Sequence, residues 1–260
     1  MEVGSPRFRT HKVFLTEILI PAYAELGSLV FAYSQGSMVE GLSDSSDIDT
    51  VFVWASTIPQ KQLRPPDGIA DGHPFPRTFD RQETLWVAGQ EFGVSHITQQ
   101  EWAQWLQLLD DGEGCSGYPM PVIAAHGLLS GVLLHDPAGT GSELQLRLNQ
   151  FPESLRLKAV SRARLGLPTY LEVLEKCDEL GDGLLFHGEL SRASCLAWIG
   201  WFSAQRRYWP LEKRLGLRLR LMDRNDLAEM EERVWSSGPK LNSRLEAFKE
   251  LIEQLLAEMP

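Results

Sequence analysis

Two aspartates, Asp47 and Asp49, stand just before an apolar run over residues 51–54. The β-branched and aromatic side chains of that run are typical of a buried strand. Because side chains alternate along a strand, both carboxylates face one side, while Ile48 between them points into the core. Neighbouring carboxylates repel each other unless a divalent cation lies between them, and hard oxygen ligands of this kind suit Mg²⁺. The sequence therefore predicts a magnesium site at Asp47 and Asp49.

A glycine and a serine upstream of this pair add a second chemical feature. Residues 29–33 are apolar and predict a strand, and Gly36 then lets the chain turn closely, since glycine accepts a positive φ without steric cost. Ser37 opens a short helical turn, whose backbone N–H groups and hydroxyl are suited to hold phosphate oxygens. Ser46, directly before Asp47, either caps and orients its turn or is an ordinary loop serine.

The order strand, Gly36-Ser37, short loop, Asp47-Ile48-Asp49, strand resembles the signature of the DNA polymerase beta-like nucleotidyltransferase superfamily. In that family Gly-Ser is followed about ten residues later by Asp-x-Asp. The resemblance implies that Asp47 and Asp49 hold one or two Mg²⁺ ions and that Gly36 and Ser37 hold the β- and γ-phosphates of a nucleoside triphosphate. Catalysis in such enzymes depends on positioning and electrostatics.

The family adds a third carboxylate on a neighbouring strand, between apolar residues, as a metal ligand or general base. In residues 90–96 the position with apolar neighbours on both sides is Gly93, which has no side chain. Glu91 has the same strand parity and would face the same side, one pleat earlier. Three alternatives remain open: Glu91 takes over the role, a base comes from the helical half of the chain, or the third ligand is missing.

Composition limits the classes of partner. The 260 residues carry a formal net charge of -10, which argues against a protein that binds nucleic-acid phosphates and mildly favours a neutral or cationic small-molecule acceptor. The three cysteines, Cys115, Cys177 and Cys195, are far apart and have no zinc spacing. The start of the chain has no signal-peptide pattern and no apolar run is long enough to span a bilayer, so we expect a cytoplasmic protein without membrane contact.

The first half of the chain predicts an α/β fold. Apolar spacing over residues 11–26 predicts a helix that Pro21 kinks or divides. Further elements are expected in the following ranges: a strand over 84–97, helices over 102–109 and 122–130, and a short last strand within 131–136. The Pro- and Gly-rich segment 56–83 has no periodicity and is either a functional flap or a surface insertion. The turn at 136–139 is the expected domain boundary, which gives a nucleotidyltransferase domain over residues 1–138.

The second half, residues 139–260, predicts an all-helical domain that covers the substrate or nucleotide. Helices are expected over 153–165, 169–180, 184–208, 211–215, 224–235 and 241–259. The pattern Tyr208-x-Pro210-x-x-Lys213 is similar to a segment in helical domains attached to small bacterial nucleotidyltransferases. That similarity implies that Lys213 reaches the triphosphate; the alternative is a solvated surface lysine. The fold class expected is thus an α/β nucleotidyltransferase domain with a mixed sheet, followed by an all-α helical-bundle domain, with the substrate in the cleft between them.

Three functional hypotheses follow. The leading one is an Mg²⁺-dependent enzyme that moves AMP from ATP onto a hydroxyl of a small-molecule acceptor, in the manner of antibiotic nucleotidyltransferases, and releases pyrophosphate. A second is transfer of AMP to a protein side chain, as in toxin–antitoxin partners of the superfamily. A third is a nucleotide-binding protein that has lost catalysis, which Gly93 motivates.

Overall fold

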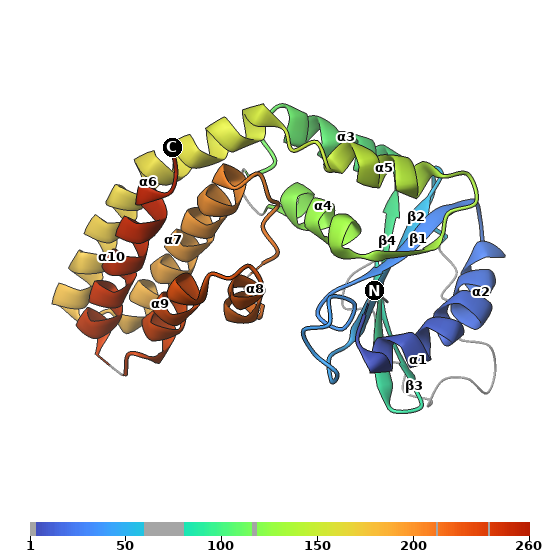
Figure 1. Ribbon diagram of the computed structural model, residues 1–260, viewed down its shortest axis with the longest axis horizontal. Coiled ribbons are helices and arrows are strands. Elements are labelled where there is room, and N and C mark those ends of the chain that lie inside the picture. Colours follow the sequence, from blue (N-terminus) through green and yellow to red (C-terminus); the bar gives the residue numbers. More distant parts are fainter. Residues whose placement is uncertain (1–3, 60–80, 116–118, 212, 239) are drawn as a thin grey trace. The chain divides into compact units, whose positions relative to one another are not determined.

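The computed structural model describes residues 4–59, 81–115, 119–211, 213–238 and 240–260 (Figure 1). These residues form two compact units. The sheet unit lies within residues 1–107 and 124–150, and the helical unit within 108–123 and 151–260. Both units are therefore made of two chain segments, whereas the sequence prediction placed a single boundary after residue 138. The central part of the predicted flap, residues 60–80, lies outside the described residues.

A five-stranded sheet forms the centre of the first unit, with the strand order β3-β4-β2-β1-β5. Its strands are β1 (Leu29–Gln35), β2 (Ile48–Trp54), β3 (Gln82–Val87), β4 (Gln90–Thr98) and β5 (Val132–His135). The central neighbours β2 and β4 run parallel, and the other pairs are antiparallel. The sheet is mixed, as the sequence predicted.

The predicted single strand over 84–97 is wrong, because this stretch is the hairpin β3–β4. Ala88 and Gly89 both adopt positive φ angles, 48° and 73°, which are the backbone values of a tight two-residue hairpin turn. Leu85 and Phe92 become cross-strand partners. The apolar positions switch from odd numbers in β3 to even numbers in β4. This change of parity is the sequence signal of the turn between them.

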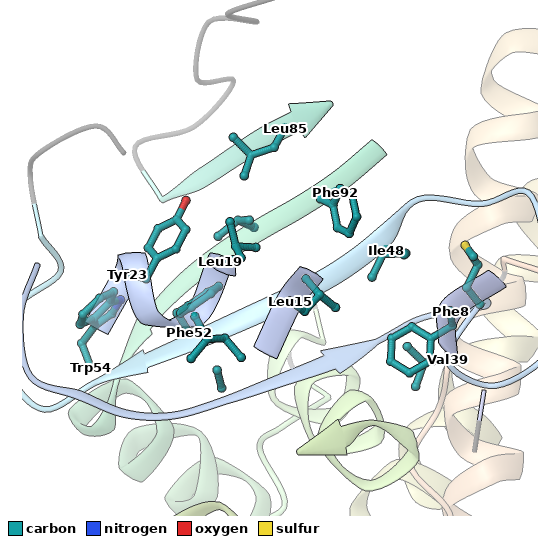
Figure 2. Packing of buried hydrophobic residues seen from close by; sticks show 14 residues of the cluster. Phe8, Leu15, Leu19, Tyr23, Val39, Ile48, Phe52, Trp54, Leu85 and Phe92 are labelled. Carbon is teal, nitrogen blue, oxygen red and sulfur yellow. The ribbon is translucent and has the colours of Figure 1, made fainter. Parts of the chain in front are cut away.

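One face of the sheet packs against the N-terminal helical run (Figure 2). This run consists of α1 (Pro6–Phe14), the π-helical turn η1 (Leu15–Leu19) and α2 (Ile20–Ala24). Pro21 has no N–H to donate to a carbonyl four residues earlier, and the residues just before it adopt the wider π pattern. The even-numbered side chains of β2, such as Ile48 and Phe52, are buried on this face. Asp49 therefore belongs to the opposite face.

Three more helices contribute to this half of the chain: α3 (Gln99–Asp110), α4 (Met120–Ser130) and α5 (Thr140–Leu148). The C-terminal end of α4 and the start of α5 approach the other face of β1 closely. A Cβ atom added to Gly131 would lie 2.6 Å from the Ser34 carbonyl oxygen, and one added to Gly141 would lie 3.0 Å from the Phe31 ring. The end of α4 and the start of α5 therefore cover part of the face of the sheet that carries Asp49.

The helical unit is built from α6 (Glu153–Leu180), α7 (Gly183–Ala204), α8 (Leu215–Leu221), α9 (Asn225–Ser236) and α10 (Leu241–Ala257). The predicted break at Pro168 is wrong, since α6 is one helix of 28 residues that contains this proline. Its buried face continues from Leu167 to Leu174 across the proline, and packing along α7 outweighs one missing hydrogen bond.

Two other helix predictions also need correction. Helix α7 ends at Ala204 rather than near Tyr208, because Arg206 takes a positive φ of 55° just beyond it. The short helix expected over 211–215 begins instead at Leu215, after Arg214 with a φ of 60°. In the described residues, no helix is both long and apolar enough to cross a membrane. The expected fold class, a mixed α/β sheet unit followed by a helical region, is confirmed.

Asp136 connects β5 to α5 and gives a test of this junction. Its carboxylate accepts hydrogen bonds of 2.9 Å from the backbone N–H groups of Gly141 and Ser142 and one of 2.8 Å from the Ser142 hydroxyl. Burial alone would raise the pKa of Asp136, but these hydrogen bonds outweigh it and hold the pKa below its usual value.

We expect Asp136→Ala to lower the free energy of unfolding by about 1 kcal/mol at neutral pH, the usual value of such a helix-start contact. A lowered folded-state pKa stabilises the protein above the pKa of the unfolded chain, about 3.9. The difference between parent and variant should therefore shrink as the pH falls through the lower folded-state pKa. Denaturant unfolding at several pH values measures this, with the exposed Asp44→Ala as control. A difference that does not depend on pH would contradict it.

Candidate active site

A row of four residues crosses the sheet on the face opposite the hydrophobic core of Figure 2. Gln35 on β1 pairs with Asp49 on β2, Asp49 pairs with Gly93 on β4, and Gly93 pairs with Thr84 on β3. Directly paired residues point to the same face of a sheet. The row lies where β1 ends and where β2 and β4 begin, so the turn at Gly36 leaves the sheet beside Asp49.

The Asp49 carboxylate lies between two glycines. A Cβ atom added to Gly36 would be 3.1 Å from Oδ2 of Asp49, and one added to Gly93 would be 2.6 Å from Oδ1. Gly36 also has a φ of 95°, a conformation that other residues rarely adopt. The two missing side chains therefore make the space that the carboxylate occupies.

Ser37 follows in a compact turn. The Glu40 N–H donates to the Gly36 carbonyl at 3.0 Å, and the Leu42 N–H donates to the Ser37 carbonyl at 2.7 Å. The Ser37 side chain is only 5% exposed, and its hydroxyl has no hydrogen-bond partner among the described residues. A buried hydroxyl without a partner is costly to maintain, and a bound oxygen ligand would satisfy it.

Asp47 is held by the loop in front of β2. The Ser46 hydroxyl donates a 2.6 Å hydrogen bond to Oδ1 of Asp47, and the buried Gln90 amide donates to the Ser46 carbonyl at 3.0 Å. Both Asp47 and Asp49 are half-buried. Ser46 thus orients the Asp47 carboxylate directly, and Gln90, which sequence reasoning missed, ties this loop to the start of β4.

Beside Gly93, where the sequence resemblance leads us to expect a third carboxylate, the Asp49 carboxylate fills the space. Glu91 is half-buried and lies two residues earlier on the same face of β4. The geometry therefore offers Glu91 as the carboxylate on the neighbouring strand, and it gives Gly93 a steric role of its own.

The donor set fits a magnesium ion that is held in part by its substrate. Within the described ranges, no three His, Cys, Asp or Glu side chains cluster as metal ligands. Mg²⁺ usually keeps several waters and is bound by one or two carboxylates together with substrate phosphates. Asp47 and Asp49, with the buried hydroxyl of Ser37 on the turn that follows β1, fit this kind of site.

Lys213 belongs to the helical unit, where its side chain is exposed. It lies in a turn next to Arg214, whose positive φ of 60° precedes α8. Its part in binding the triphosphate stays a prediction.

The chain matches no protein-family model and no curated protein. Among solved structures it is similar to the crystal structure of a nucleotidyltransferase-like protein from Exiguobacterium sibiricum 255-15. The two chains are 15% identical with a TM-score of 0.45, and the match covers 94% of this chain and 74% of that one. The chemistry of the site is therefore argued from its own residues.

The contact between Gly93 and Asp49 can be tested by a double-mutant cycle. We expect Gly93→Ala to lower the free energy of unfolding by about 1–3 kcal/mol, the usual cost of overpacking. In an Asp49→Ala background the same change should cost less, because the carboxylate that the new Cβ would meet is gone. Chemical denaturation of the four proteins measures the coupling, and an equal cost in both backgrounds would rule out the contact.

Proposed function

We propose that the protein is an Mg²⁺-dependent nucleotidyltransferase that moves a nucleoside monophosphate, AMP from ATP being the expected case, onto a hydroxyl of a small molecule. One observation supports this most: the Asp49 carboxylate lies against Gly36, the residue that opens the turn with the buried Ser37 hydroxyl. A carboxylate for a cation and donors for phosphate oxygens are thus adjacent, as a metal–triphosphate complex requires.

Each residue of the motif has a part in holding the nucleotide. The Gly36-Ser37 turn binds the β- and γ-phosphates through backbone N–H groups and the Ser37 hydroxyl. Asp47, oriented by Ser46, and Asp49 hold the cation. Mg²⁺, when bound, neutralises charge that develops on the phosphates during transfer. The sequence resemblance also assigns Lys213 to these phosphates, and that assignment stays a prediction.

The transfer itself is a single substitution at phosphorus. The acceptor hydroxyl oxygen bonds to the α-phosphorus, and the bond from that phosphorus to the oxygen that bridges to the β-phosphate breaks. Pyrophosphate leaves with that electron pair, and the hydroxyl proton passes to Glu91 as general base. Tyr33 on the same face is unsuited to this role, because burial raises its pKa well above the usual tyrosine value and the phenol stays protonated at neutral pH.

Net charge is the property of the chain that bears on the class of acceptor. The net charge of -10 favours a neutral or cationic small molecule over a nucleic acid. Transfer to a protein side chain is the alternative. The lack of a carboxylate at Gly93 motivates a third possibility, nucleotide binding without transfer. A screen of small hydroxyl compounds with labelled ATP, read by mass spectrometry and by pyrophosphate release, distinguishes these cases.

The first functional prediction concerns the two aspartates. Asp47→Asn and Asp49→Asn should each reduce Mg²⁺-dependent pyrophosphate release by several orders of magnitude, because each removes a ligand of the ion that carries transition-state charge. Thermal unfolding should show that both variants remain folded. Asp44→Asn, an exposed aspartate in the same loop, is the matched control and should keep parental turnover. Near-normal turnover in either site variant would exclude the assignment.

The second concerns Glu91. Glu91→Gln should leave ATP affinity unchanged and lower transfer by about a hundredfold or more, the usual contribution of a general base. Ser95→Ala, on the same face of β4 but farther along the strand, serves as control. Calorimetry with ATP and Mg²⁺ separates binding from transfer. If Glu91→Gln transfers as well as the parent, Glu91 is not the base.

A further inference from the structure

Two neighbouring residues of α4, His126 and Gly127, contact the chain on both sides of the Gly36-Ser37 turn. Gly127 meets Gln35, the residue immediately before the turn, and His126 meets Glu40, which closes it. All of these residues belong to the sheet unit. His126 and Gly127 both lie outside the sequence motif.

The contact between Gln35 and Gly127 is very close. A Cβ atom added to Gly127 would lie 1.7 Å from Oε1 of Gln35 and 2.8 Å from its Cδ. The Gln35 carboxamide therefore directs its oxygen at Gly127, into space that the Cβ of any other residue at position 127 would fill. Its Oε1 is buried and makes no hydrogen bond in the part of the chain that is described. Steric fit, rather than hydrogen bonding of this oxygen, thus holds the residue beside Gly36.

The second contact fixes the other side of the turn. Nε2 of His126 lies 3.5 Å from Oε2 of Glu40, and the two side chains are 23% and 15% exposed. The backbone N–H of the same Glu40 donates to the Gly36 carbonyl at 3.0 Å. Glu40 therefore connects α4 to the hydrogen bond that closes the turn.

Helix α4 itself is anchored to the sheet. It leads through Gly131 into β5, which pairs with β1, and Gly131 lies so close to β1 that an added Cβ would be 2.6 Å from the Ser34 carbonyl oxygen. A residue carried by a helix packed on a strand is positioned more firmly than one carried by a loop.

We propose that α4 sets the position of the Gly36-Ser37 turn, so that His126 and Gly127 are positioning residues for the nucleotide triphosphate. The identity of the ligand in this proposal rests on the proposed function. The mechanical role of the helix does not. Displacing the turn by a fraction of its size would move Gly36 away from the Asp49 carboxylate and the Ser37 hydroxyl away from the phosphates.

The test uses Gly127→Ala in the full chain. Its Cβ should push Gln35 and with it Gly36, so the amide hydrogens of Glu40 and Leu42 should exchange with solvent about tenfold faster without nucleotide, as expected for a loosened turn. The Kd for ATP with Mg²⁺ should rise about tenfold, as expected for misplaced binding groups. Gly188→Ala is the matched control, because Gly188 is also helical but has nothing within 4 Å of its added Cβ.

Two further sets of variants keep the test independent of folding defects. Adding Gln35→Ala to Gly127→Ala removes the clashing side chain and should restore slow exchange. Glu40→Gln and His126→Gln should each loosen the turn. The double variant should loosen it by less than the sum of the two single effects, since either change breaks the same contact.

The outcomes separate this inference from the proposed function. Unchanged exchange at Glu40 and Leu42 in folded Gly127→Ala and Glu40→Gln would overturn the inference. Faster exchange with an unchanged Kd for ATP would overturn the positioning role for the nucleotide. Faster exchange in a protein whose parent binds no ATP would support the mechanical role and exclude the proposed function.

Discussion

The close approach of the Asp49 carboxylate to two stretches of backbone is the constraint on which the rest of the site depends. Oδ1 and Oδ2 of Asp49 lie where side chains at Gly93 and Gly36 would otherwise be. A carboxylate in such a position has few rotamers open to it, so little conformational entropy is lost when it binds a cation. The same contact brings the turn after β1, which carries the Ser37 hydroxyl, against the strand that carries Asp49.

This approach requires β4 to be the parallel neighbour of β2 in the register that sets Gly93 opposite Asp49. The even-numbered residues of both strands fix that register, because Ile48 and Phe92 are paired and buried in the core that α1, η1 and α2 cover. A slip of one residue would turn the apolar side chains into the site and the carboxylate into the core. The hydrophobic face of the sheet thus determines the geometry of the polar face.

Sequence reasoning predicted those candidate site residues that lie close together in the chain. Gly36, Ser37, Asp47 and Asp49 are recognisable because a turn and an adjoining strand follow from neighbouring residues alone. The same reasoning found the mixed sheet and the helical second half. It missed the β3–β4 hairpin, whose turn contains neither Pro nor Asn. It also missed the continuity of α6, because tertiary packing overrides the local preference of a proline to end a helix. The parts played by Gln90 and His126 depend on residues 44 and 86 positions away, and no local pattern contains them.

The structure gives Gly93 a different interpretation from the one that the sequence suggests, because it shows the Asp49 carboxylate beside this glycine. From the sequence it is a departure from the family pattern, and it motivates the hypothesis of a lost activity. In the structure, it is the residue that leaves room for Asp49, whose Oδ1 lies 2.6 Å from the position of a Cβ. An aspartate at position 93 would displace the carboxylate it is supposed to assist, and two charges so close would repel each other. A third carboxylate compatible with this arrangement must come from elsewhere on the same face, and Glu91 is the acidic residue that β4 supplies there. Gly93 and Glu91 are therefore consistent with a site in which the acidic group of β4 lies one pleat earlier than the sequence resemblance predicts.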